Sequence, residues 1–131
     1  GIIREITTGL SRRPSEMTFA SIWKFGGAVQ QVAADATGFG DRSMPFMLSL
    51  DAIWSKPEDD GANIAWARAL WKDMQRHSTG RLYLNFPGHG EGEYLVRDAF
   101  GVETYARLQM VKRKYDPANF FRRNSNVQPV G

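Results

Sequence analysis

Tyr83 and Asn85 form the pair in this 131-residue chain whose types and spacing best suit chemistry. They flank Leu84 in residues 81–86, a short aliphatic and aromatic stretch that predicts a β-strand. Because residues two apart in a strand point the same way, a phenol and a carboxamide would lie side by side. Such a pair offers a proton acceptor and a hydrogen-bonding group for a planar polar ligand. The alternative is an edge-strand pair whose polar groups are satisfied by water.

Other candidate motifs do not have the spacing that their chemistry needs. The segment 88–92 is rich in glycine but has neither dinucleotide-fingerprint nor P-loop spacing, so it predicts a flexible loop. His77 and His89 are the only histidines, the chain has no cysteine, and the acidic run 58–60 suits the start of a helix. We therefore predict no metal site.

The elements that must position Tyr83 and Asn85 can be predicted from periodicity and turn residues. In residues 46–54 the apolar side chains alternate, which is typical of a strand with one buried face. We expect strands at 17–25, 46–54 and 81–86, and helices at 2–10, 64–74, 94–100 and 102–115. Paired glycines, Gly26 and Gly27, predict a turn, and residues 28–34 are ambiguous between a short helix and irregular structure. The order predicts an α+β fold, an antiparallel sheet of about three strands covered by helices on one face.

Composition excludes several classes of protein. A hydrophobic fraction of 42%, including 8 Phe, is enough for a packed core, so the chain as a whole is not expected to be disordered. The net charge of +3 arises from 17 basic and 14 acidic residues, and the short basic clusters 112–114 and 122–123 predict a solvated face. A nucleic-acid site there is the alternative, and its affinity would fall steeply with salt. We expect no nucleic-acid partner.

Membrane and compartment signals are also absent from the sequence. No apolar run approaches the roughly 18 residues that a membrane span requires, so we expect no membrane partner. The lack of cysteine fits a reducing compartment, and we expect a cytoplasmic protein. The chain opens at Gly1 without a methionine, so we expect either processing or a longer product.

Three motifs in order along the chain resemble the C-terminal signature of berberine bridge enzyme-like FAD-linked oxidases. They are Y-x-N at residues 83–85, R-L-x-x-V-K at 107–112 and Y-D-P-x-N-x-F-R at 115–122. Residues 23–29 and 35–42 resemble the family's bacterial members, although Gly38 stands for Ala and Asp41 for His. Several spaced matches are far more specific than any one of them.

The resemblance implies a fold, an activity and partners. Residues 1–131 would be the C-terminal part of the substrate domain, whose sheet lies over the flavin ring, with the segment that returns to the FAD domain. The FAD-binding domain would be absent from this chain, so the chain alone would be inactive and is not expected to retain FAD. The parent protein would transfer hydride from a small organic substrate to the flavin, and oxygen would usually reoxidise it.

By the same resemblance, five residues have expected roles. Tyr83 is the candidate base or proton relay, Asn85 and Asn119 are candidate flavin-binding residues, and Phe39 and Arg42 would line the substrate cavity. The family often has Tyr where this chain has Phe86, which argues against a mechanism with two tyrosines. Tyrosine ordinarily ionises near pH 10, so a base role needs support from its surroundings, for which Arg42 is the candidate.

A different class of function also fits the sequence. The alternative is a non-catalytic module that forms a homodimer, or binds a protein partner, through the open edge of its sheet. Its mass in solution would distinguish it from a chain whose partner is an FAD-binding domain.

Overall fold

The computed structural model describes residues 1–86, 94–123 and 125–131. The glycine-rich segment 88–92, with His89, lies outside the described residues. The chain divides into two compact units, and each is described by itself. The first unit contains Gly1–Lys24 and Phe46–Gly80, and the second contains Phe25–Pro45 and Arg81–Gly131.

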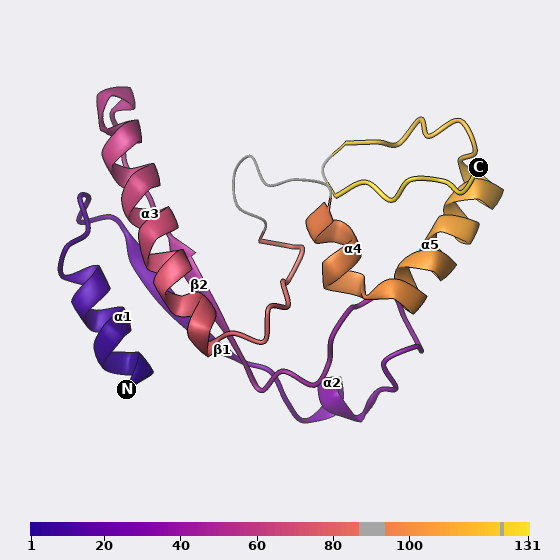
Figure 1. The fold of residues 1–131 in the computed structure, drawn as a ribbon, viewed down its shortest axis with the longest axis horizontal. Coiled ribbons are helices and arrows are strands. Elements are labelled where there is room, and N and C mark those ends of the chain that lie inside the picture. Colours follow the sequence, from indigo (N-terminus) through magenta and orange to yellow (C-terminus); the bar gives the residue numbers. More distant parts are fainter. Residues whose placement is uncertain (87–93, 124) are drawn as a thin grey trace. The chain divides into compact units, whose positions relative to one another are not determined.

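The first unit is a β-hairpin with two helices. Strands β1 (Phe19–Lys24) and β2 (Phe46–Asp51) pair antiparallel, from Phe19 opposite Asp51 to Lys24 opposite Phe46 (Figure 1). Its helical elements are α1 (Ile2–Leu10), the 3-10 turn η1 (Pro57–Asp59), α3 (Asp60–Met74) and the 3-10 turn η2 (Gln75–His77). The two predicted strands and the helices at 2–10 and 64–74 are thus confirmed.

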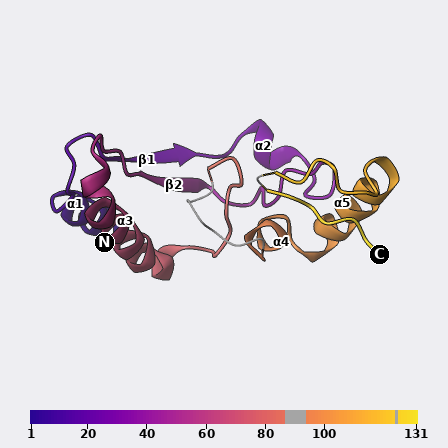
Figure 2. The same ribbon diagram turned by 90° about the horizontal axis from the view of Figure 1, so that it is seen from above.

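The core of this unit forms where α1 and α3 cover one face of the hairpin (Figure 2). The alternation predicted for residues 46–54 brings Leu48 and Leu50 to that face, where they pack with Ala20 from β1. Three buried side chains from the helices complete the core: Ile6, Leu70 and Met74. On the opposite face Phe19 and Trp23 stay about half exposed, at 49% and 51%. Helices on one face are therefore confirmed.

The predicted third strand at 81–86 is wrong: the described residues contain a sheet of two strands, not about three. The backbone amide of Phe86 donates to the carbonyl oxygen of Tyr83 at 3.1 Å and closes a turn. An extended strand keeps these two groups apart and directs them to neighbouring strands. The local apolar content of residues 81–86 therefore predicted a strand where the chain forms a turn.

The second unit contains three helices: α2 (Ala28–Gln31), α4 (Tyr94–Phe100) and α5 (Val102–Tyr115). Gly101, with φ of 75°, joins α4 to α5, and α4 contributes the buried residues Val96 and Ala99. Gly40, with φ of 83°, lies so close to α4 that an added Cβ would be 2.8 Å from the carbonyl oxygen of Ala99. Glycine is therefore needed here both for its φ and for the close approach.

Asp116 ends α5 and organises the turn that follows. Its carboxylate accepts hydrogen bonds from Lys112 Nζ at 2.5 Å and from the backbone amides of Phe120 at 2.7 Å and Phe121 at 3.0 Å. The hydrogen bond from Lys112, supported by the two amides, lowers the pKa of Asp116 below its ordinary value of 3.8. The ionised side chain therefore holds residues 116–121 in a compact turn.

Two kinds of feature are absent from the described residues. None of their helices has the length and apolar character needed to cross a membrane. No three His, Cys, Asp or Glu side chains within residues 1–86, 94–123 and 125–131 gather as metal ligands.

The close approach at Gly40 predicts that alanine is destabilising at this position but not at Gly61. Gly40→Ala should lower the free energy of unfolding by at least about 1 kcal/mol, because Ala disfavours positive φ and its Cβ would clash with the Ala99 carbonyl. Gly61→Ala, in α3 with open space around it, should be neutral or stabilising by about 0.5 kcal/mol. Urea unfolding of both variants measures the contrast, and equal effects would contradict it.

The lowered pKa of Asp116 predicts a pH-dependent contribution to stability. Because the folded-state pKa is depressed, the contribution is complete above 3.8 and is lost as the pH falls through the lower folded-state value. Asp116→Asn should therefore destabilise the protein near neutral pH, and the difference should shrink in acid. Unfolding curves across this range test it, with Asp73→Asn as the control, since no resolved hydrogen bond within the described residues involves the Asp73 carboxylate. A difference independent of pH would refute the assignment.

Candidate functional site

Tyr83 and Asn85 meet in the second unit, as their types and spacing predicted, but through a turn instead of a strand. The side-chain Nδ2 of Asn85 donates a hydrogen bond to the phenol oxygen of Tyr83 at 2.8 Å. The same turn, closed by the bond from Phe86 to Tyr83, brings the two side chains together. The phenol oxygen therefore has a neighbouring amide donor from two residues away.

The ring of Tyr83 lies among three phenylalanine rings. Its centroid is 5.6 Å from Phe25, 5.8 Å from Phe39 and 5.7 Å from Phe86. The rings of Phe25 and Phe39 also meet edge to face at 6.5 Å. Such tilted and edge-to-face contacts are the favoured aromatic geometries and add to the energy of apolar burial. The four residues, Phe25, Phe39, Tyr83 and Phe86, are called the aromatic cluster below.

Local backbone features direct two of these rings. Phe25 directly follows β1, where its amide donates to the carbonyl oxygen of Pro45 at 2.9 Å. Phe39 lies between Gly38, which approaches the side chain of Leu108 in α5, and Gly40, which approaches Ala99. Because neither glycine carries a side chain, the backbone around Phe39 can lie directly against α4 and α5.

Arg42 adjoins the aromatic cluster. Its Nη1 donates to the carbonyl oxygen of Val29 at 3.3 Å and its Nη2 to Thr37 Oγ1 at 2.5 Å. The guanidinium carbon lies 4.5 Å from the centre of the Phe39 ring, a cation–π contact. Its buried Nε has no hydrogen-bond partner among the described residues. The structure thus groups Tyr83, Asn85, Phe39 and Arg42 in one region of the second unit.

Asn119, the fifth predicted residue, has different surroundings. It occupies the turn after α5 with φ of 51°, a left-handed conformation that asparagine tolerates better than most residues. Its Nδ2 donates to Gln128 Oε1 at 3.1 Å, and its buried Oδ1 has no partner among the described residues. Its hydrogen bonds therefore link it to the C-terminal tail and not to the other four.

Sequence reasoning missed two residues of the region, Phe25 and Asp41. Phe25 was predicted only as the last residue of a strand at 17–25, and nothing local indicates that its ring contacts Tyr83. Asp41 accepts hydrogen bonds from the hydroxyl and amide of Ser43, which lower its pKa, and lies 3.8 Å from Arg81. The spacing of Asp41 and Ser43, typical of a side-chain-closed turn, was a usable signal.

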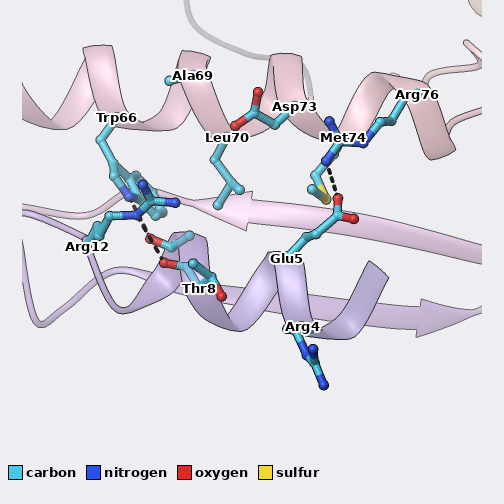
Figure 3. Close-up of a pocket in the computed structure, with 11 residues that line it drawn as sticks. Arg4, Glu5, Thr8, Arg12, Trp66, Ala69, Leu70, Asp73, Met74 and Arg76 are labelled. Atoms are coloured by element: carbon cyan, nitrogen blue, oxygen red, sulfur yellow. Dashed lines mark hydrogen bonds and ion pairs between the residues drawn. The ribbon is translucent and has the colours of Figure 1, made fainter. Parts of the chain in front are cut away.

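A groove of about 390 Å³ lies in the first unit between α1 and α3 (Figure 3). Trp66 crosses from α3 and donates to the carbonyl oxygen of Gly9 at 3.0 Å, close to where Leu70 contacts α1. Near the other end Glu5 accepts hydrogen bonds from Arg76 at 2.5 Å and from His77 at 2.9 Å when that nitrogen is protonated. The groove is a seam of helix packing, and none of the five predicted site residues lines it.

The side chains around Tyr83 determine what chemistry this part of the second unit could perform. They include a phenol that can exchange a proton, amide groups that can hydrogen-bond with both donors and acceptors, and aromatic rings that can form walls. The edge of a flavin ring carries alternating donors and acceptors, which amides complement. The buried Oδ1 of Asn119, in the turn after α5, has no partner among the described residues and is available to accept a hydrogen bond from a donor of this kind.

Comparisons with known proteins show what this chain resembles. Residues 82–128 match the family model described as Berberine and berberine like. Aclacinomycin-N/aclacinomycin-A oxidase of Streptomyces galilaeus is 27% identical over 131 residues, with 85% of this chain and 23% of that protein covered. The uncharacterized FAD-linked oxidoreductase YgaK of Bacillus subtilis is 32% identical over 113 residues, with 85% and 24% covered. The chain thus spans about a quarter of the length of these relatives.

A solved structure shares the fold. Chitooligosaccharide oxidase superposes with a TM-score of 0.73 at 21% sequence identity, over 98% of this chain and 30% of the other. The family match, the relatives and the shared fold agree on one relationship. The chain is related in sequence to berberine bridge enzyme-like FAD-linked oxidoreductases and shares the fold of part of a solved oxidase.

Proposed function

We propose that this chain is the part of an FAD-dependent oxidoreductase that covers the flavin ring and handles the substrate's proton. A separate FAD-binding domain of the same protein would hold most of the cofactor. The relatives named as FAD-linked oxidoreductases, each about four times as long as the matched region, support this division. Residues 1–131 would then supply the C-terminal part of the substrate domain and the returning segment.

The observation that carries the proposal is the hydrogen-bonded pair of Tyr83 and Asn85 at the edge of the aromatic cluster. FAD, when bound, supplies the acceptor for a hydride from a substrate C–H bond. Loss of hydride from an alcohol also requires loss of its hydroxyl proton. Tyr83 is the group in this region that can accept or relay that proton at its phenol oxygen.

Asn85 assists Tyr83 directly in this proposal. Its N–H donates to the phenol oxygen at 2.8 Å, which fixes the position of this oxygen beside the carboxamide. The three phenylalanine rings hold the Tyr83 ring in one orientation. Phe86 has no hydroxyl, so the proton would pass through one phenol here and not through two adjacent ones.

The remaining predicted residues divide between cofactor and substrate. Asn119, with its buried acceptor, and Asn85, with its second amide N–H, would meet the polar edge of the flavin. Phe39, next to Tyr83, would line the substrate side, and Arg42 would support it through its contact with the Phe39 ring. The relatives named for aclacinomycin and chitooligosaccharides make these compounds suitable first probes for a small organic substrate.

Flavin retention tests the proposed division of the cofactor site. The 131-residue chain purified alone should show no flavin absorption near 450 nm and retain no added FAD after gel filtration, whereas the full-length protein should retain it. Visible spectra and intact mass measure both. Tight FAD binding by the chain alone would place the main cofactor site within these residues and overturn the division.

Replacing Tyr83 tests the proposed chemistry. Tyr83→Phe in the full-length protein should slow anaerobic bleaching of the flavin by chitooligosaccharide or aclacinomycin probes by about 100-fold or more, the usual contribution of a general base. Flavin content should be unchanged. Tyr115→Phe, which removes a phenol that is 73% exposed on α5, is the control and should bleach at the wild-type rate. A fully active Tyr83→Phe would rule out this role.

A further inference from the structure

We infer that Arg42 is a positioning residue that acts on Tyr83 through Phe39, instead of contacting the substrate itself. This inference deepens the proposed function of Tyr83 and rests on it. In outline, the guanidinium orients the Phe39 ring, and that ring forms a fixed wall beside the phenol.

The first step is the set of hydrogen bonds that Arg42 makes. Nη1 donates to the carbonyl oxygen of Val29 at 3.3 Å and Nη2 to Thr37 Oγ1 at 2.5 Å, so one side chain joins α2 to the segment that follows it. Nε is shielded from solvent and has no hydrogen-bond partner among the described residues. One N–H of each terminal nitrogen thus donates within the protein, and these two bonds hold the guanidinium in place.

The second step is the ring beneath the guanidinium. The guanidinium carbon lies 4.5 Å from the Phe39 centroid, close enough for a cation–π contact. A planar guanidinium can keep its face on a ring while its edge donates two hydrogen bonds, which the ammonium of lysine cannot do. Arg42 is therefore suited to fix the orientation of Phe39.

The adjacent carboxylate does not compete for Arg42. Asp41 accepts two hydrogen bonds from Ser43, at 2.8 Å and 2.7 Å, and lies 3.8 Å from Arg81. No ion pair of Arg42 occurs among the described residues, so the partners of its charge there are two hydrogen-bond acceptors and the Phe39 ring.

The third step is the contact between Phe39 and Tyr83. The two centroids are 5.8 Å apart, with an angle of 46° between the ring planes. Gly38 and Gly40 hold the backbone of Phe39 against α5 and α4 but place no side chain beside its ring. The orientation of the Phe39 ring then depends on Arg42 on one side and on the neighbouring rings of the aromatic cluster on the other side.

The experiment uses fluorine NMR of the full-length protein labelled with 3-fluorotyrosine, in which Tyr83→Phe assigns the Tyr83 signal. Arg42→Met should shift or broaden that signal, and Phe39→Leu should do so as well. Because Arg42 acts through Phe39, the double variant should resemble Phe39→Leu alone. Arg107→Met is the control: Arg107 donates to the carbonyl oxygen of Asp35 at 2.7 Å in the same loop, and the Tyr83 signal should stay in place.

Two results would overturn the inference. One is an Arg42→Met protein whose Tyr83 signal stays in place while Phe39→Leu moves it. The other is a double variant whose shift equals the sum of the two single shifts, since independent effects add. If Arg42→Met fails to fold, Arg42→Lys replaces it, keeps the charge without the planar fork, and should show a smaller shift of the same kind.

Kinetics with chitooligosaccharide or aclacinomycin probes give a second readout. A positioning role predicts that Arg42→Met lowers kcat about 10- to 100-fold and leaves KM within about twofold. The reason is that even a small misplacement of a reacting group slows the chemical step. A raised KM at unchanged kcat would indicate direct substrate contact and overturn the inference. If Tyr83→Phe keeps full activity, the function proposed for Tyr83 fails, but the fluorine signals still decide whether Arg42 acts through Phe39.

Discussion

Contacts among four aromatic rings connect segments that lie far apart in the sequence, and the candidate site depends on them. Phe25 and Phe39 come from the segment between the two strands, while Tyr83 and Phe86 come from the turn after α3. Each ring pair combines apolar burial with a favoured tilted or edge-to-face geometry. Without these contacts the Tyr83 ring would have no fixed surroundings, and the bond from Asn85 would be an isolated contact at the surface.

The first unit is stabilised separately, by helices that pack on its hairpin. A two-stranded hairpin is marginal alone, so α1 and α3 must cover one of its faces. Gly9 allows the helices to meet closely: Leu70 occupies the space where a side chain would project, and Trp66 donates to the Gly9 carbonyl. The other face retains half-exposed Phe19 and Trp23.

Much of the local structure could be predicted from residue patterns. The helices at 2–10, 94–100 and 102–115 appear at their expected bounds, because periodicity, glycine and proline are local signals. The prediction failed at 81–86, where aliphatic and aromatic residues suggested a strand and a turn formed. Such residues can be buried in either conformation, and long-range partners decide between them.

The site shows the same division between local and long-range information. The sequence by itself determined that Tyr83 and Asn85 would be neighbours, because a spacing of two brings side chains together in a strand and did so here in a turn. It also supplied the motifs through which the family relationship is visible. Only the tertiary structure decided that Phe25 and Phe39 meet Tyr83, and that Arg42 lies over Phe39 while Asn119 bonds to the C-terminal tail. The physical reason is that contacts between residues tens of positions apart depend on how the intervening chain folds, and no local pattern encodes that path.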